Sequence, residues 1–405
     1  MHLNSLTAHK ILNSRNEPTI AVTAEVKGKK VEASAPSGKS KGKYEVKEFS
    51  SKGLDFSIAF VNSLGKKLVD EKINFEVFDD LKKVEDLVNK YDATKNLSFV
   101  GGNTLYVLET AILKALAINE EKELWEFLLQ GKKPKIPLPL GNCIGGGLHI
   151  KQGKKTDFQE FLIMPRTKKI FDAQFINIQF YNQALKEIKE KDVLWQDTFT
   201  DENAIGATLN NEEVLELMNN IREKMQDKFN VKIDLGLDAA SSSLWQAQMY
   251  RYKNKKYELT TKDQQEFIKK ISQDFNVYYI EDPLNENDFQ GFSVLNSNLK
   301  NKLIVGDDLT ATNPERVERA LKMKSINGLI IKPNQIGSLI KTRQVIEMAR
   351  QHNITMIISH RSGETLDNAL AHFAVGWQIP IIKCGIVGKE RLAKINELIR
   401  IEKSV

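Results

Sequence analysis

VYYIEDPLNENDFQGFSVLNSNLKNKLIVGDD (277–308) contains the pattern that decides the fold of this chain. An apolar run ends on an acidic residue, a segment of helix length follows, and a second apolar run again ends on an acidic residue. Six runs end on a charged or histidine side chain in this way, at Asp238, Glu281, Asp307, Lys332, His360 and Lys383. The last five of these residues are separated by 26, 25, 28 and 23 residues, which is the period of a strand, a helix and two turns. We therefore predict an α/β fold with a (β/α)8-type barrel, in which all the strand ends converge on one pocket.

The residues before the barrel predict a smaller α+β domain. Alternation of apolar and polar residues over 19–35 predicts a β-hairpin, and 81–88 predicts an amphipathic helix. The segment 103–117 is apolar on nearly all sides, so we expect a buried helix there. Three prolines in GKKPKIPLPLG (131–141) predict the boundary, with an N-terminal domain at 1–130 and the barrel at 131–405.

Composition excludes several classes of protein. The net charge of +6 over 405 residues is mild and comes from scattered lysines, which suits an anionic substrate and gives no reason to expect a specific nucleic-acid partner. Two cysteines without a CxxC spacing indicate a reducing compartment. No signal peptide and no run of about 18 apolar residues is present, so we expect a cytoplasmic protein without a membrane span.

Three of the strand-end residues suggest a metal site. Asp238, Glu281 and Asp307 would offer only oxygen atoms, a set that suits Mg²⁺ better than zinc or copper. One acidic residue at a strand end is more often a helix cap, but three on successive strands favour a metal. Since neighbouring side chains of a strand point to opposite faces, we expect Asp307 in the site and Asp308 behind it.

Lys332 follows four apolar residues in GLIIK (328–332). Burial and nearby cations would lower its pKa and make it a candidate general base. The alternative is an ordinary surface lysine. Upstream in the sequence, Glu202 in QDTFTDE (196–202) is a further candidate for the same pocket.

Two more segments supply polar side chains suited to an anionic ligand. ISHRSGET (358–365) offers His360, Arg361 and Ser362 for a phosphate or carboxylate. GNCIGGGLH (141–149) and DFQEFLIMP (157–165) add His149, Gln159 and Glu160. The glycines here lack the GxGxxG spacing of a dinucleotide site.

Several motifs together resemble the enolase family. They are ILNSRNEPT (11–19), QEF (159–161), IEDP (280–283), GDDLTATNP (306–314), SHRSGET (359–365) and RLAKINELIRIE (391–402). The resemblance covers essentially the whole chain, and PLGNCIGGG and KPNQIG look closer to archaeal members than to bacterial ones. It implies an enzyme, phosphopyruvate hydratase, which interconverts 2-phosphoglycerate and phosphoenolpyruvate with Mg²⁺.

The resemblance also implies a role for each site residue. Asp238, Glu281 and Asp307 match the ligands of a first Mg²⁺, and Ser40 matches the serine that joins a second one when a mobile lid near 36–43 closes. Lys332 matches the base, and Glu202 with its partner Glu160 matches the acid that helps the β-hydroxyl leave. The remaining matches are Lys383 for the substrate carboxylate, Arg361 and Ser362 for the phosphate, and His149, Gln159 and His360 in the pocket.

Two departures from the family pattern keep alternatives open. The lid reads SGKSKG in place of SGAS-TG, and the turn at Glu202 reads Asp-Glu-Asn-Ala. One alternative is a family enzyme acting on a related acid, such as a phosphonate analogue. The other is an enolase-like binding protein with weak turnover. The partners expected from the resemblance are a small phosphorylated acid and further copies of the chain, in a homodimer or a higher oligomer.

Overall fold

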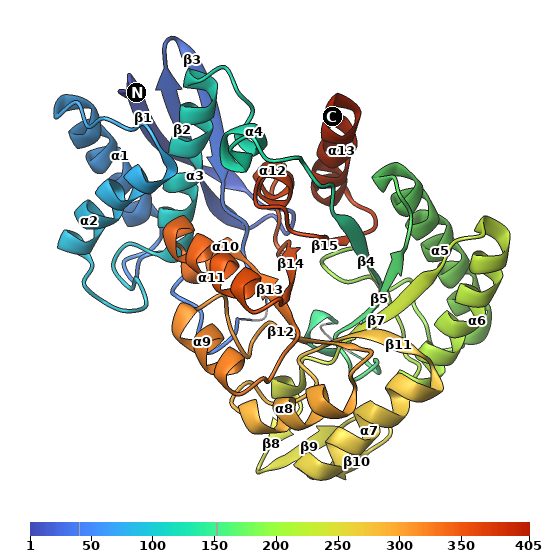
Figure 1. Cartoon of the computed structure of the whole chain (residues 1–405). Coiled ribbons are helices and arrows are strands. Elements are labelled where there is room, and N and C mark those ends of the chain that lie inside the picture. The colour runs from blue at the N-terminus through green and yellow to red at the C-terminus, as the bar shows by residue number, and fades with distance from the viewer. Residues whose placement is uncertain (40, 151–152) are drawn as a thin grey trace.

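The computed structural model describes residues 1–39, 41–150 and 153–405 of the chain. Ser40, the predicted lid ligand, lies outside the described residues. Figure 1 shows a barrel surrounded by helices, with a smaller sheet-and-helix unit beside it.

The smaller unit begins with an antiparallel sheet of three strands in the order β1-β2-β3. Its strands are β1 (Ser5–Leu12), β2 (Pro18–Val26) and β3 (Lys29–Ser34). Lys27 and Gly28 make the turn between β2 and β3 with positive φ, a conformation that glycine adopts at little cost. The predicted hairpin at 19–35 is confirmed.

Four helices complete this unit: α1 (Leu54–Asp70), α2 (Leu81–Tyr91), α3 (Gly102–Asn119) and α4 (Leu124–Leu129). α3 packs on β2 and β3 and also contacts α1, α2, α4, α10 (Pro333–Ile336) and α11 (Leu339–Gln351), so it is buried on nearly every side. The predicted buried helix and the amphipathic helix α2 are both confirmed.

Eight strands form the barrel. They are β4 (Leu138–Gly145), β5 (Glu160–Pro165), β7 (Ile233–Asp238), β11 (Val277–Glu281), β12 (Leu303–Gly306), β13 (Gly328–Ile331), β14 (Thr355–Ser359) and β15 (Ile381–Gly385). The ring closes where β15 pairs with β4. The two-residue strand β6 (Ile205–Gly206) pairs with the C-terminal end of β4. The predicted barrel is confirmed.

One strand runs against the expected direction. β5 is antiparallel to both of its neighbours, β4 and β7, whereas the other barrel strands are parallel. The expectation that every strand delivers its C-terminal end to the site was therefore wrong for β5. Its first residue, Glu160, lies at the end of the barrel where the parallel strands finish. The cause is the connection: the described residues between β4 and β5, 146–150 and 153–159, form no crossover helix, and parallel strands need a crossover connection.

The helices that surround the barrel follow the strands along the chain. They are α5 (Ile170–Lys191), α6 (Asn211–Phe229), α7 (Thr261–Asp274), α8 (Phe289–Asn298), α9 (Pro314–Lys322), α10, α11, α12 (Ala369–Gly376) and α13 (Lys389–Ser404). α10, α11 and α12 also contact the smaller unit, through α3, α2 and α4. Between β7 and α7 lies a small sheet that the sequence analysis did not predict, made of β8 (Trp245–Gln246), β9 (Met249–Tyr252) and β10 (Tyr257–Leu259).

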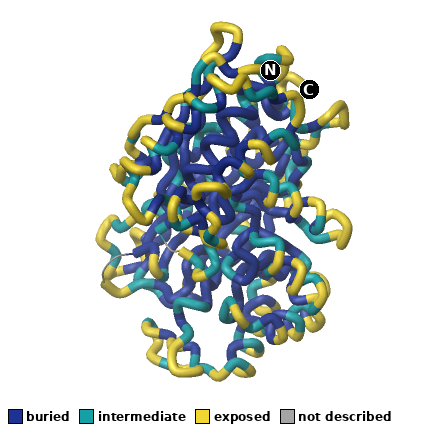
Figure 2. The backbone as a smooth tube through the Cα atoms, turned by 90° about the vertical axis from the view of Figure 1, so that its left-hand side faces the viewer, coloured by how far each residue is buried: buried dark blue, intermediate teal, exposed yellow. Residues whose placement is uncertain are grey.

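Apolar side chains fill the inside of the barrel and set the position of the site. Tyr279, Val305, Ile330 and Ile381 belong to one buried cluster. Because side chains of a strand alternate between its two faces, the residue two positions later points to the same interior. The site residues Glu281, Asp307, Lys332 and Lys383 stand at those positions. Figure 2 shows the barrel interior buried and the exposed residues concentrated in outer loops.

A search of the helices in the described part of the chain found none with the length and the apolar character that crossing a membrane requires.

Candidate active site

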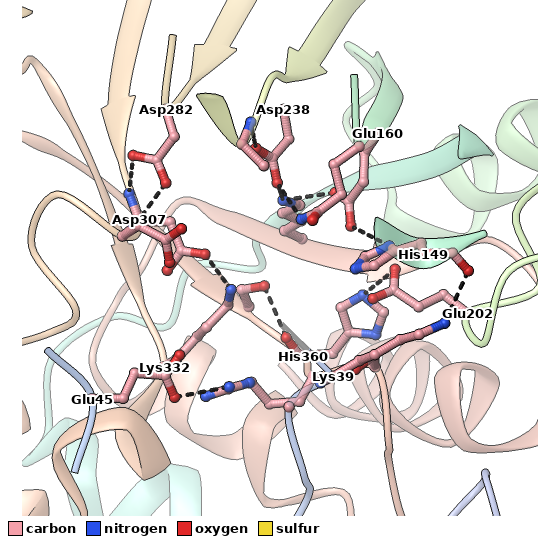
Figure 3. A pocket seen from close by; sticks show the side chains of 18 residues that line it. Lys39, Glu45, His149, Glu160, Glu202, Asp238, Asp282, Asp307, Lys332 and His360 are labelled. Carbon is pink, nitrogen blue, oxygen red and sulfur yellow. Dashed lines mark hydrogen bonds and ion pairs between the residues drawn. The ribbon is translucent and has the colours of Figure 1, made fainter. Parts of the chain in front are cut away.

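A polar cavity lies at the rim where the parallel strands end. The predicted residues that line it are His149, Gln159, Glu160, Glu202, Asp238, Asp307, Lys332, His360, Arg361, Ser362 and Lys383. Glu281 is fully buried and contacts Lys383, one of the lining residues. Figure 3 shows that the side chains labelled there reach the cavity from several different strands and loops.

Asp238 and Glu281 stand side by side, because they are direct partners in the pairing of β7 with β11. Asp238 accepts a hydrogen bond from the backbone N–H of Ala240 at 2.9 Å. Glu281 accepts one from the Tyr279 hydroxyl at 2.6 Å through Oε2, whereas its Oε1 is buried without a hydrogen-bond partner among the described residues. That oxygen is therefore free to bind a further group.

Lys383 is the cation between these carboxylates. Its Nζ lies 2.7 Å from Glu160, 2.7 Å from Glu281 and 3.3 Å from Asp238. Burial alone would lower the pKa of Lys383, but the surrounding carboxylates outweigh it and hold the pKa well above its usual value. Lys383 therefore stays charged, as a group that binds an anion should.

Asp307 contacts a different lysine. Asp307 and Lys332 form an ion pair, and Gln335 donates a hydrogen bond of 3.0 Å to the other oxygen of Asp307. Burial would lower the pKa of Lys332, yet the contact with Asp307 raises it above its usual value. The expectation of a lowered pKa was therefore wrong for this structure, since an opposite charge in contact outweighs burial and the more distant Arg361.

Asp308 also faces the site. The prediction that only Asp307 enters it was wrong: both residues line the cavity, and their carboxylate oxygens lie within 4.8 Å of each other and of Asp282. Strand alternation does not extend to Asp308, because this residue lies two positions beyond Gly306, the last residue of β12. Asp282 accepts hydrogen bonds from the backbone N–H groups of Asp307 at 3.1 Å and Asp308 at 2.7 Å.

A second group of side chains lies across the cavity, around Glu202. The carboxylate of Glu202 is 3.3 Å from Nε2 of His360 and accepts a hydrogen bond of 3.0 Å from Asn142. His149 lies 3.8 Å from Glu160, and oxygen and nitrogen atoms of His149, Glu160 and Glu202 come within 4.8 Å of one another.

These buried groups differ in their preferred charge. Burial raises the pKa of Glu160 well above its usual value, although Lys383 opposes the effect. Burial lowers the pKa values of His149 and His360, although Glu202 opposes it in both. At neutral pH the two histidines are therefore neutral hydrogen-bonding groups, and Glu160 retains a proton far more readily than a solvent-exposed glutamate.

Arg361 and Ser362 close the cavity on the side of the smaller unit. Arg361 pairs with Glu45 at 2.9 Å and donates to Asn334 at 3.3 Å. The hydroxyl of Ser362 accepts hydrogen bonds from Arg15 at 3.0 Å and from the backbone N–H of Lys39 at 2.8 Å.

The residues of this site that the sequence analysis missed include Asn142, Asp282, Gln335 and Glu45. Asp282 directly follows Glu281 in the motif IEDP, so a signal was present. Asn142 and Gln335 lie within GNCIGGG and KPNQIG, where their partners Glu202 and Asp307 are distant in sequence. No local pattern distinguishes Glu45.

Comparison with known proteins agrees with this geometry. The family model described as "Enolase, N-terminal domain" matches residues 3–128, and that described as "Enolase, C-terminal TIM barrel domain" matches residues 133–405. A protein named enolase from Methanothermobacter thermautotrophicus is 37% identical, with 100% of this chain and 97% of the relative covered. Another, from Pyrobaculum aerophilum, is 35% identical over 99% of this chain and 96% of the relative.

Both family models and the full-length relatives thus match the chain that carries the carboxylate and lysine cavity described above. The chain belongs to the enolase family, and it is an enzyme of the phosphopyruvate hydratase class.

Proposed function

We propose that this enzyme interconverts 2-phosphoglycerate and phosphoenolpyruvate plus water, with Mg²⁺, by removal of the α-proton and loss of the β-hydroxyl. The observation that carries the proposal is the placement of Lys332 and Glu160. Lys332 directly follows β13 and Glu160 begins β5, and these are opposite strands of the eight-stranded ring. A substrate held in the middle would have a base on one side and acidic groups on the other.

The acidic residues fit a magnesium ion. Asp238, Glu281 and Asp307 come from three successive strands of the ring and offer only hard oxygen ligands. The unpartnered buried Oε1 of Glu281 supports this fit, since buried polar atoms normally have a partner. Bound Mg²⁺ would stabilise the negative charge that builds up on the substrate carboxylate as the α-proton leaves. We propose two ions per site, with Ser40 as a ligand of the second.

Lys332 would act as the base. It must be neutral to accept a proton, and its contact with Asp307 favours the charged form. If Asp307 is bound to a metal ion instead, burial and the neighbouring Arg361 and Lys383 act together to lower the pKa of Lys332. Metal binding and activation of the base would then be coupled through Asp307.

Glu202 would help the β-hydroxyl leave, with Glu160 as its partner. Burial raises the pKa of Glu160 well above its usual value, so this residue takes up a proton far more readily than an exposed glutamate and would supply one on this side of the cavity. The neutral rings of His149 and His360 and the amide of Gln159 would hold substrate oxygens by hydrogen bonds. Because the ring separates base and acid, the two proton transfers can take place in separate steps.

The remaining cations would bind the substrate's charges. Lys383 would contact the carboxylate, and Arg361 with Ser362 would contact the phosphate, since a guanidinium can hold two phosphate oxygens at once. The segment 36–43 would close over the substrate as a lid that excludes water. We also propose that the chain works as a homodimer or a higher oligomer, and that the boundary between its two domains lies near residue 130.

The test follows phosphoenolpyruvate formation from 2-phosphoglycerate by ultraviolet absorbance, with Mg²⁺ and then with excess EDTA. Lys332→Ala should lose about 10²- to 10⁴-fold in kcat, the usual contribution of a positioned general base. The exposed Lys322→Ala is the matched control and should keep full activity. Folded protein with Mg²⁺ that shows no turnover would refute the proposal. Phosphonate analogues would then be the next substrates to measure.

A further inference from the structure

The contacts of Lys39 set it apart from the other lysines around the site. Lys39 lines both the active-site cavity and an outer cavity of about 710 Å³, so its segment forms part of the wall between them. The segment is anchored just before it, where the backbones of Ser37 and Gly363 pair through hydrogen bonds of 2.7 and 2.8 Å. Figure 3 shows Lys39 beside Glu202 and His360, at the edge of the cavity.

Lys39 connects three other segments of the chain. Its backbone N–H donates to the hydroxyl of Ser362 at 2.8 Å. Its ammonium donates to the backbone carbonyl of His149 at 3.0 Å and pairs with Asp201 at 3.1 Å. Ser362 follows β14, His149 follows β4 and Asp201 precedes β6, so one residue joins three segments that are far apart in sequence.

The ion pair with Asp201 is sheltered from solvent. Only 18% of the Lys39 side chain and 20% of the Asp201 side chain are exposed, so water and salt screen this pair less than a surface pair. Lys41, two residues later, pairs with Glu48 at 2.7 Å, but 54% of its side chain is exposed and it lines only the outer cavity. Lys41 is therefore a matched control on the same segment.

The two acceptors of the ammonium are next to proposed catalytic groups. Asp201 directly precedes Glu202, and the carbonyl belongs to His149 itself, whose ring faces Glu160. Holding both at about 3 Å restricts the backbone that carries these side chains. The ammonium of Lys39 is paired with the carboxylate of Asp201. The main effect of Lys39 is therefore to position these segments and not to neutralise the charge of the substrate.

We propose that Lys39 is a positioning residue. It links the segment 37–39 to the turn that carries Glu202 and to the loop that carries His149, and so holds these two side chains where the reaction needs them. The inference rests on the proposed function, because it assigns Lys39 to the acid side of that reaction. It assigns a task to the lysine at which this chain departs from the family pattern.

The first test compares Lys39→Ala, Lys39→Arg, Asp201→Asn and Lys41→Ala in the full-length enzyme. We expect Lys39→Ala and Asp201→Asn each to lower kcat about tenfold, with KM changing less, and the double variant to be no worse than the poorer single one. Lys39→Arg should recover most of kcat, and Lys41→Ala should stay within about twofold of the original, as surface pairs contribute little. Multiplying effects in the double variant, or an equal loss in Lys41→Ala, would overturn the proposal. So would a rise in KM alone, since that outcome would make Lys39 a substrate-binding charge.

A second readout does not depend on turnover. Trypsin cleavage after Lys41 and Lys43 should be several-fold faster in Lys39→Ala than in the original chain, and Lys39→Arg should restore the slow rate. If the original chain fails to turn over 2-phosphoglycerate, the proposed function fails. The trypsin rates would still test whether Lys39 holds the segment 37–39 in place. Equal cleavage rates in the original chain and Lys39→Ala would refute it.

Discussion

Glu160, the first residue of β5, is the direct pairing partner of Asp238, the last residue of β7. Two carboxylates meet at one rim because the two strands run in opposite directions. Lys383 lies within 2.7 Å of Glu160 and 3.3 Å of Asp238. The reversed strand thus places a carboxyl group with a raised pKa next to the proposed metal ligands, where a parallel strand would have placed Pro165, the last residue of β5.

Glu202→Gln should abolish most of the activity without affecting the fold. The amide keeps the size of the side chain and a hydrogen-bonding oxygen for Asn142, but it cannot transfer a proton. We expect kcat to fall about 10²- to 10⁴-fold, as is typical of a positioned acid or base. Steady-state kinetics and a thermal unfolding curve should be recorded together. The exposed Glu216→Gln serves as control, and an unchanged kcat in Glu202→Gln would rule out its role as the acid.

Mg²⁺ should stabilise the folded chain, and Glu281 should be needed for this. A ligand that binds only the folded state raises the free energy of unfolding by about 2.7 kcal/mol at 100 times its Kd. We expect a higher melting temperature with Mg²⁺ and a much smaller rise in Glu281→Gln, which lacks one carboxylate oxygen. The exposed Asp274→Asn should respond like the original chain. Equal rises in all three proteins would contradict the assignment of Glu281 as a ligand.

Gly38→Ala should weaken substrate binding through Arg361. A Cβ atom at Gly38 would lie 1.9 Å from Nη2 of Arg361, and the guanidinium is buried and held by Glu45 and Asn334. It would have to move and lose contacts to the phosphate. Loss of one charge-assisted hydrogen bond, about 1.5–3 kcal/mol, corresponds to a rise in KM of about 10- to 160-fold. Steady-state kinetics measure it, and an unchanged KM would show that Arg361 adapts freely or does not bind the phosphate.

Glu397 on α13 should contribute stability that is lost in acid. Its hydrogen bond with His372, 3.0 Å from Nε2 to the carboxylate, together with Arg400, lowers the pKa of Glu397 from 4.5 to about 2. A lowered pKa means that the stabilisation is complete above the unfolded-state value and disappears as the pH falls from about 4.5 towards 2. Urea unfolding at pH 7, 4 and 3 measures this.

The control for this prediction is Glu397→Gln, which cannot ionise. The difference in free energy of unfolding between the original chain and this variant should be largest at pH 7 and should shrink at pH 4 and again at pH 3. A difference that stays constant with pH would show that the ion pair with His372 and Arg400 adds nothing beyond a neutral hydrogen bond.

The barrel and most of its site were predictable from the sequence because both depend on local patterns. Strand alternation has a period of two, so a charged residue two positions after a barrel-lining side chain must face the same interior. Ile330 and Lys332 illustrate this, as do Tyr279 and Glu281. The interval between successive strand ends then determined the fold class, since it matches one strand and one helix with their turns.

Tertiary structure alone decided the features that depend on contacts between distant segments. The direction of β5 follows from a connection without a helix, and Asp308 faces the cavity because β12 ends before it. The raised pKa of Lys332 comes from Asp307, which directly follows a different strand, β12. Lys39 gains its proposed task from Asp201, His149 and Ser362. For Lys332 and Lys39 the deciding interaction is a contact between residues far apart in sequence, and such a contact leaves no periodic pattern along the chain.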